Sequence, residues 1–297
     1  MRSSSVRQIS MCLAVSGGLA LTIVTATKPA AATTADPITG YVYDNILYQQ
    51  TSNSAPTSPQ GYFFDMGVYF NTAGDYTKGT TFYPGHPPQT LPAPAGSTQF
   101  DYESSLYSTM SALHAAYPFG HYAITASGGS SGTATASINY THDYFTHAIP
   151  YLTNYSSLNG LNAAANFLVD YDSFTPNSRV SQGFTFFTIT DASTGATVFS
   201  DPFQAPSSMS ALISAGTLSP DTTYDYELDF SDRLNGYDWK NGSFTVQGFD
   251  VRTDGSFTTG GAETPLPAAL PLFASGIGAM GLFGWRRKRK AAAIAAA

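Results

Sequence analysis

Short alternating segments separated by turn-forming residues dominate the middle of the chain. Gly, Ser, Thr and Pro recur there about every eight to twelve residues, a spacing typical of strands joined by turns. The clearest segment, 224–230, places Tyr, Leu and Phe side chains on one face and three carboxylates on the other. That alternation is expected of a half-buried strand. The sequence therefore predicts an all-β fold of one or two antiparallel β-sandwich domains.

Residues 36–146 are expected to form the first, β-rich domain, which contains one helix. The helix is predicted over 104–117, because Leu106 and later apolar residues fall on one stripe that Pro118 ends. Alternation predicts four strands in this domain, at 41–48, 61–70, 121–127 and 133–140.

Residues 148–253 are expected to form a second β-sandwich, with a hairpin across 191–195. The stretch Leu218-Ser219-Pro220-Asp221-Thr222-Thr223-Tyr224 resembles the Leu-x-Pro-x-Thr-x-Tyr signature of fibronectin type III domains. In those domains the Tyr hydroxyl bonds to upstream backbone in a tyrosine corner. The resemblance implies a fibronectin type III-like sandwich in which Tyr224 closes the same corner, and a fold of this kind implies no chemistry by itself.

Charged and sulfur-containing residues narrow the range of partners. All twenty acidic residues lie between Asp36 and Glu263, where only five of the thirteen cations lie. Nucleic-acid affinity depends on Lys and Arg that displace counterions, so nucleic acid is disfavoured as a partner. The single cysteine, Cys12, lies near the N-terminus, which leaves the body without disulfides or thiolate metal sites. We expect no metal and no other cofactor.

The N-terminus has the three-part build of a secretory signal peptide. Arg2 and Arg7 precede an apolar run over 11–26, and small residues follow it. We predict a signal helix within a signal peptide at 1–32, which signal peptidase removes. The alternative is a retained N-terminal anchor, which Gly17 and Gly18 inside the run disfavour.

The C-terminus combines an apolar span with a basic cluster, after a predicted flexible spacer at 254–263. Residues 268–285 carry no charge and would extend about 27 Å as a helix, enough to cross a bilayer core. The positive-inside rule then keeps the basic cluster in the cytoplasm and the body outside the inner membrane. The cluster consists of Arg286, Arg287, Lys288, Arg289 and Lys290.

Pro265, Leu266 and Pro267, followed by the apolar span and the basic cluster, resemble the PEP-CTERM sorting tail in a Pro-Leu-Pro variant. The resemblance covers 264–290. It implies that an exosortase reads the three residues as a recognition motif, and that the host is a Gram-negative bacterium that makes extracellular polysaccharide. We therefore expect a protein that is exported across the inner membrane, transiently anchored there, and then located at the cell surface or in the extracellular matrix.

Motifs for catalysis are weak. Gly128-Gly129-Ser130-Ser131-Gly132 fits the G-x-S-x-G pattern of a hydrolase, but that motif needs a helix after the Ser, whereas 133–140 alternates as a strand. We interpret the loop as a hairpin connection without a catalytic residue. The carboxylates of Asp170, Asp172 and segment 225–229 have the alternation of a glycosidase pair or a Ca²⁺ site. The same alternation is expected of any solvated strand face, which is the interpretation that we favour. His142-Asp143 and His147 lack metal-ligand spacing, and the two histidines are interpreted as interdomain-linker residues on a polar surface.

A loop predicted at 235–242 holds the only Trp of the body. Tyr237, Asp238 and Trp239 would bind a sugar if the rings stack on it and the carboxylate accepts from its hydroxyls. The alternative is an aromatic plug at the end of the sandwich.

These patterns favour a non-catalytic, exosortase-sorted surface or matrix protein associated with exopolysaccharide or biofilm. The alternatives are a carbohydrate-binding module that uses Tyr237 and Trp239, and a secreted polysaccharide hydrolase.

Overall fold

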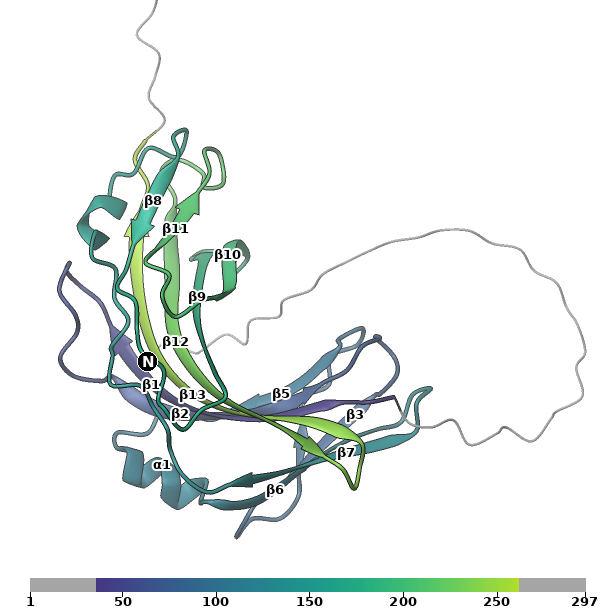
Figure 1. Ribbon diagram of the computed structural model, residues 1–297. Coiled ribbons are helices and arrows are strands. Elements are labelled where there is room, and N and C mark those ends of the chain that lie inside the picture. The colour runs from purple at the N-terminus through teal and green to yellow at the C-terminus, as the bar shows by residue number, and fades with distance from the viewer. Residues whose placement is uncertain (1–35, 262–297) are drawn as a thin grey trace, which may run out of the picture. The chain divides into compact units, whose positions relative to one another are not determined.

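The computed structural model describes residues 36–261. Within that range the chain forms thirteen strands, one α-helix and one short 3-10 helix (Figure 1). The strands are β1 (Thr39–Gln49), β2 (Gly61–Tyr69), β3 (Lys78–Phe82), β4 (Gln89–Leu91), β5 (Gln99–Glu103), β6 (Gly120–Ser127), β7 (Thr133–Tyr140), β8 (Phe167–Asp170), β9 (Gln182–Asp191), β10 (Thr197–Gln204), β11 (Ser210–Ile213), β12 (Thr223–Asp238) and β13 (Ser243–Thr258). The helices are α1 (Met110–Ala116) and the 3-10 helix η1 (Tyr155–Leu158).

Seven strands form one large sheet in the order β10-β9-β12-β13-β1-β2-β5. Its two longest strands, β12 and β13, have sixteen residues each and pair antiparallel along their whole length. Strand β1 pairs parallel with β13, from Thr39 opposite Phe244 to Gln49 opposite Asp254. The other neighbours in this sheet are antiparallel. The predicted all-β sandwich fold is confirmed, with one parallel pair inside the large sheet.

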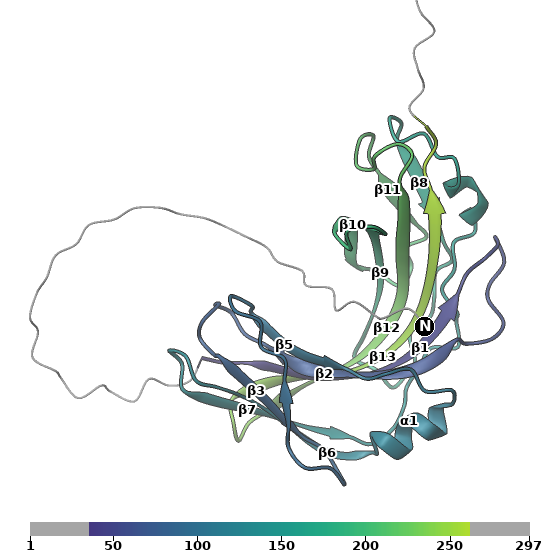
Figure 2. The ribbon, with the colours of Figure 1, turned by 180° about the vertical axis from the view of Figure 1, so that it is seen from behind.

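Two smaller sheets pack on separate stretches of the large one (Figure 2). The four-stranded sheet β4-β3-β6-β7 encloses a first hydrophobic cluster that includes Phe64 and Phe249. The two-stranded sheet β11-β8 encloses a second cluster that includes Val169 and Phe257. Phe249 and Phe257 lie an even number of residues apart on β13, so they point to the same face. Both cores are therefore built on one face of one sheet.

The two predicted domains share this sheet. Strand β13 comes from the predicted second domain, yet its partner β1 comes from the predicted first domain. Gln49, at the end of β1, also donates a side-chain hydrogen bond to the carbonyl of Asp254, 205 positions away. The predicted boundary at 146–148 thus falls between the two cores. The backbone hydrogen bonds of the shared sheet connect these cores.

The predicted bounds of the helix and of the spacer are wrong. The helix begins at Met110, not at 104, because Tyr107 exchanges backbone hydrogen bonds with Tyr62 and stays extended. Thr109 caps the helix by accepting from the amide of Ala112. The predicted spacer is also shorter than expected, because residues 254–258 continue β13 opposite β12. Aromatic burial explains the continuation, since Phe257 of this segment is buried in the second cluster.

The predicted tyrosine corner is present. The amide of Ser219 donates a hydrogen bond of 2.8 Å to the hydroxyl of Tyr224, whose ring is buried in the second cluster. Tyr171 is buried in the same cluster. The second cluster therefore has a fibronectin type III-like corner built from the predicted residues.

No helix within residues 36–261 is long and apolar enough to cross a membrane. The predicted signal peptide at 1–32 and the predicted sorting tail at 264–290, with its helix at 268–285, lie outside the described residues.

Candidate functional site

The three residues predicted to contact a sugar lie where β12 meets the turn to β13. Tyr237 and Asp238 end β12 and Trp239 begins the turn, so the predicted loop at 235–242 is shorter than expected, because 235–238 continue to pair with β13. Asp238 organises this turn, because its two carboxylate oxygens accept from the amides of Lys240, at 3.1 Å, and Ser137, at 3.0 Å. The side-chain amide of Asn241 adds a third hydrogen bond of 2.7 Å. Burial opposes ionisation, but the hydrogen bonds from Asn241 and Ser137 lower the pKa of Asp238. The carboxylate therefore holds the turn to β7 of the neighbouring sheet.

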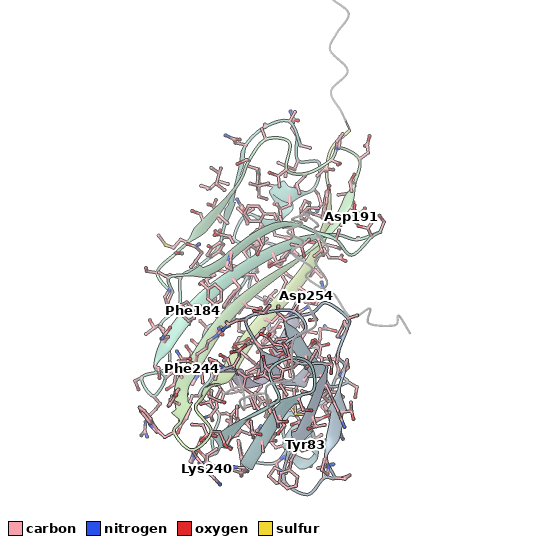
Figure 3. The ribbon with its side chains drawn as sticks, turned by 90° about the vertical axis from the view of Figure 1, so that its right-hand side faces the viewer. Tyr83, Phe184, Asp191, Lys240, Phe244 and Asp254 are labelled. Carbon is pink, nitrogen blue, oxygen red and sulfur yellow. The ribbon has the colours of Figure 1, made fainter. Side chains whose placement is uncertain are left out.

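Three aromatic side chains are exposed at this turn, and we call Tyr237, Trp239 and Phe244 the aromatic tip. Trp239 is 87% exposed, Phe244 54% and Tyr237 39%. Tyr237 makes edge contacts with both others, with ring centroids 4.6 Å from Trp239 and 5.1 Å from Phe244. Figure 3 shows Phe244 and Lys240 at the same end of the large sheet. Sequence reasoning missed Phe244, because it did not predict β13, which pairs Phe244 with Tyr237.

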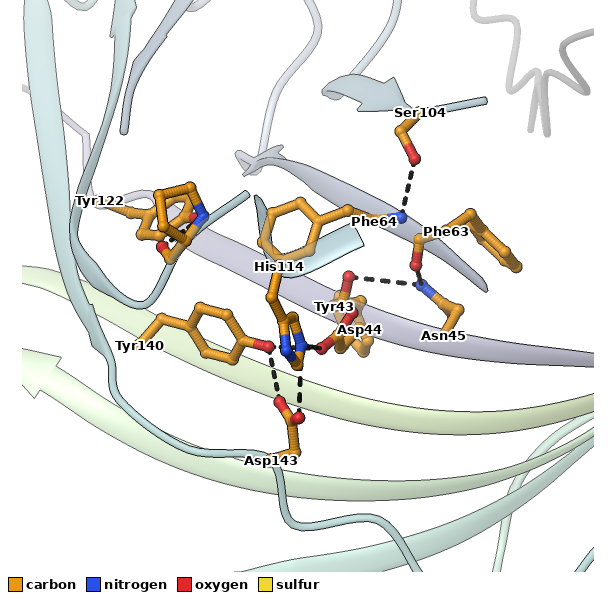
Figure 4. Close-up of polar contacts among 11 residues, drawn as sticks. Tyr43, Asp44, Asn45, Phe63, Phe64, Ser104, His114, Tyr122, Tyr140 and Asp143 are labelled. Atoms are coloured by element: carbon orange, nitrogen blue, oxygen red, sulfur yellow. Dashed lines mark hydrogen bonds and ion pairs between the residues drawn. The ribbon is translucent and has the colours of Figure 1, made fainter. Parts of the chain in front are cut away.

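A second group of polar side chains meets where α1 faces β1 and the end of β7, and we call Asp44, His114, Tyr140 and Asp143 the polar cluster (Figure 4). Asp44 lies on β1 and is fully buried, His114 lies on α1, and Tyr140 ends β7. His114 Nε2 lies 2.9 Å from Asp44 Oδ2 and 3.3 Å from Asp143 Oδ2. The Tyr140 hydroxyl contacts Asp44 Oδ2 and lies 2.7 Å from Asp143 Oδ1.

The cluster shifts the ionisation of its members. Burial, with a contribution from the Asp44 carboxylate, raises the pKa of Asp143 to about 6. The hydrogen bond to Asp44 raises the pKa of His114 despite partial burial. Burial and both carboxylates raise the pKa of Tyr140, which keeps its hydroxyl protonated. Asp44 Oδ1 is buried and has no hydrogen-bond partner.

His142 and His147 are exposed, as expected of linker residues, whereas Asp143 between them was not predicted as a site residue. Asp143 is half-buried because the chain turns after β7 and brings it within reach of Tyr140. Asp44 and His114 were not predicted as site residues. The available signal was a carboxylate within the apolar strand 41–48, since a buried acid requires partners from elsewhere in the fold.

The carboxylates at 225–229 lie on the face of the large sheet opposite the two cores. Arg252 on the neighbouring strand bridges Glu227 at 2.8 Å and Asp254 at 2.7 Å. Burial raises the pKa of Asp229, and its Oδ1 is shielded from solvent without a hydrogen-bond partner. The expected fully solvated face is therefore wrong for Asp229, because the side chains of Glu227, Asp250 and Arg252 crowd around it on this face.

The G-x-S-x-G segment connects β6 to β7, and a strand follows it as predicted. The Ser130 hydroxyl donates to Asp75 at 3.3 Å, and that of Ser131 donates to Asp36 at 3.0 Å. These hydrogen bonds hold the turn, and the strand–turn–helix setting of a nucleophile elbow is absent from this segment.

No protein-family profile and no curated protein matches the chain. Among solved structures, the FN1–FN3 domains of chicken CNTN1 match with 9% identity and a TM-score of 0.24, over 77% of this chain and 67% of that one. Salmonella alpha-2-macroglobulin reacted with methylamine matches with 9% identity and a TM-score of 0.23, over 77% and 15%. A tetra-tandem repeat from a large adhesion protein matches with 15% identity and a TM-score of 0.19, over 72% and 49%. The fold defines a β-sandwich protein with a fibronectin type III-like part.

Proposed function

We propose that the chain is an exported, non-catalytic surface or extracellular-matrix protein that binds extracellular polysaccharide through its aromatic tip. The observation that carries the proposal is the 87% exposure of Trp239, beside Tyr237 and Phe244, on a turn fixed by Asp238. Exposed apolar side chains that cluster on a soluble surface mark interaction sites. Aromatic rings offer flat apolar faces beside a polar group, which suits the mixed surface of a sugar ring.

The turn is suited to this role because its backbone is fixed before a ligand binds. Hydrogen bonds from Lys240, Asn241 and Ser137 hold Asp238, and the Tyr237 ring is packed between Trp239 and Phe244. A preorganised site loses less conformational entropy on binding. An acidic body without a basic surface also suits a neutral polysaccharide better than a polyanion.

Export and sorting complete the proposal. Signal peptidase would remove 1–32, and an exosortase would act at Pro265, Leu266 and Pro267 while the span at 268–285 holds the chain in the inner membrane. The basic cluster at 286–290 would fix the orientation of that span. The mature protein would then reside on the surface or in the matrix of a Gram-negative bacterium, with exopolysaccharide or biofilm as its setting.

Binding of the full chain to a polysaccharide array tests the tip. We expect Trp239→Ala to weaken binding roughly tenfold, or about 1.4 kcal/mol, because the most exposed stacking face is lost. Phe82→Ala is the matched control, since Phe82 is also exposed, at 45%, but lies on β3 outside the tip. Equal binding by wild type and Trp239→Ala, or no binding by the wild type, would refute the role of the tip.

A further inference from the structure

Three metal-ligating side chains from distant parts of the sequence converge in the polar cluster. Their nearest ligand atoms, from Asp44, His114 and Asp143, all lie within 4.8 Å of one another. Ligand atoms that share one ion at about 2.0–2.2 Å are separated by about 3 to 3.5 Å. The separations of 2.9 and 3.3 Å from His114 Nε2 to the two carboxylates already match that spacing.

The hydrogen-bonding protons in the cluster are too few for its acceptors. The Tyr140 hydroxyl has one proton and contacts both Asp44 and Asp143. His114 Nε2 has at most one proton and also faces both carboxylates. In addition, Asp44 Oδ1 is fully buried with no hydrogen-bond partner. This oxygen of the buried carboxylate lacks a donor, and a cation bound to the cluster would offset the cost of burying the charge.

The ligand set selects the class of cation. One imidazole nitrogen with two carboxylates suits a divalent transition metal such as Zn²⁺, which binds His and Asp together in four-coordinate sites. Ca²⁺ prefers six to eight oxygen ligands and Mg²⁺ retains several waters, so neither suits an enclosed site with a nitrogen ligand. We propose that Asp44, His114 and Asp143 bind one Zn²⁺-class ion, with water in the fourth position and Tyr140 as a hydrogen-bond donor to one of the ligating carboxylates.

The ion has a structural role in this arrangement. Asp44 belongs to the large sheet, His114 to α1, and Asp143 to the segment that follows β7. One ion would tie these three parts together, and an ion that binds only the folded state stabilises it by mass action. The inference is independent of polysaccharide binding, because the cluster and the aromatic tip share no residue.

Calorimetric titration and thermal unfolding of the full chain, first stripped with chelator, test the site. We expect one Zn²⁺ to bind at the cluster and to raise the unfolding temperature, whereas Ca²⁺ and Mg²⁺ at the same concentration do neither. His114→Gln and Asp143→Asn should each weaken Zn²⁺ binding at least tenfold. His142→Gln is the matched control, because His142 is exposed and near Asp143 in sequence, and it should leave binding unchanged. Equal affinity in all four proteins, or no Zn²⁺ binding by folded wild type, would overturn the proposal.

A measurement on the wild type alone avoids any folding defect of the variants. Diethyl pyrocarbonate modifies accessible imidazole nitrogens, and mass spectrometry locates the modified histidines. We expect Zn²⁺ to protect His114 at least tenfold while His142 and His147 react at the same rate with and without the ion. Equal reactivity of His114 in both conditions would contradict the site.

Discussion

Carboxylates with buried oxygens show where individual residues depart from the expectation drawn from their local pattern. Alternation placed Asp229 on a face that we expected to be solvated, and no local pattern singled out Asp44. Both have an oxygen that is buried without a hydrogen-bond partner, because side chains from other elements of the fold surround them. The aromatic tip was predictable at Tyr237 and Trp239, since an exposed turn depends mainly on nearby residues. The polar cluster was not predictable, because its members meet only through the tertiary fold.

The buried carboxyl group of Asp232 makes the stability of the fold depend on pH. Its side chain is fully buried, Oδ2 accepts from the amide of Asn177 and Oδ1 has no partner. Burial raises its pKa from 3.8 to about 6. A raised pKa in the folded state favours the protonated form of Asp232. The stability that this group contributes is therefore fully present below about pH 4 and is lost as pH rises through about 6. We predict that the free energy of unfolding falls by about 1 to 3 kcal/mol from this group between pH 4 and 7.

Urea denaturation across that pH range measures the effect. Asp232→Asn keeps an acceptor for Asn177 but cannot ionise, so its fall in stability with rising pH should be smaller than that of the wild type. Asp221→Asn, at an exposed position whose backbone conformation Asn tolerates, serves as the control and should follow the wild type. If the stability of Asp232→Asn changes with pH as that of the wild type does, Asp232 is not the source of the pH dependence.

Strands could be predicted where their own residues alternate, and the helix could be predicted where its apolar residues fall on one stripe. The segments 41–48, 61–70, 121–127 and 133–140 are strands as expected, and 224–230 lies within β12. Strand β13 was missed, although it is central, because Gly248 and Gly255 interrupt its pattern. Those glycines are required by neighbours on other strands, and Tyr43 and Tyr226 lie across them. A pattern confined to one strand does not record such a requirement.

Gly248 tests the parallel pairing of β1 with β13. It lies opposite Tyr43, and a Cβ at Gly248 would overlap the Tyr43 ring. We predict that Gly248→Ala lowers the free energy of unfolding by about 2 to 4 kcal/mol, because the sheet cannot accommodate the methyl group without moving the ring. In a Tyr43→Ala background the same change should cost less than about 0.5 kcal/mol, since the overlap is gone. Equal costs in both backgrounds, measured by urea denaturation, would show that the ring does not lie across Gly248.

For the molecule as a whole, the class of fold could be predicted but its connectivity could not. Composition and turn spacing indicated β-sandwiches, and the corner at Tyr224 indicated the fibronectin type III-like part. The joining of both parts through β1 and β13 depends on a pairing between segments about 200 positions apart, which local patterns do not encode. The result is one large sheet that carries two cores on one face and the aromatic tip at one end of its longest strands.

The proposal that this molecule acts outside the cell is tested most directly by intact-mass analysis of the chain from fractionated producing cells. We predict that the form at the surface or in the matrix begins at Thr33 and ends near Pro265 to Pro267, without the basic cluster at 286–290. Changing Pro265 and Pro267 to Ala should leave a form that retains this cluster in the membrane fraction. Recovery of the chain in the cytoplasm with Met1 and the complete C-terminus intact would contradict export.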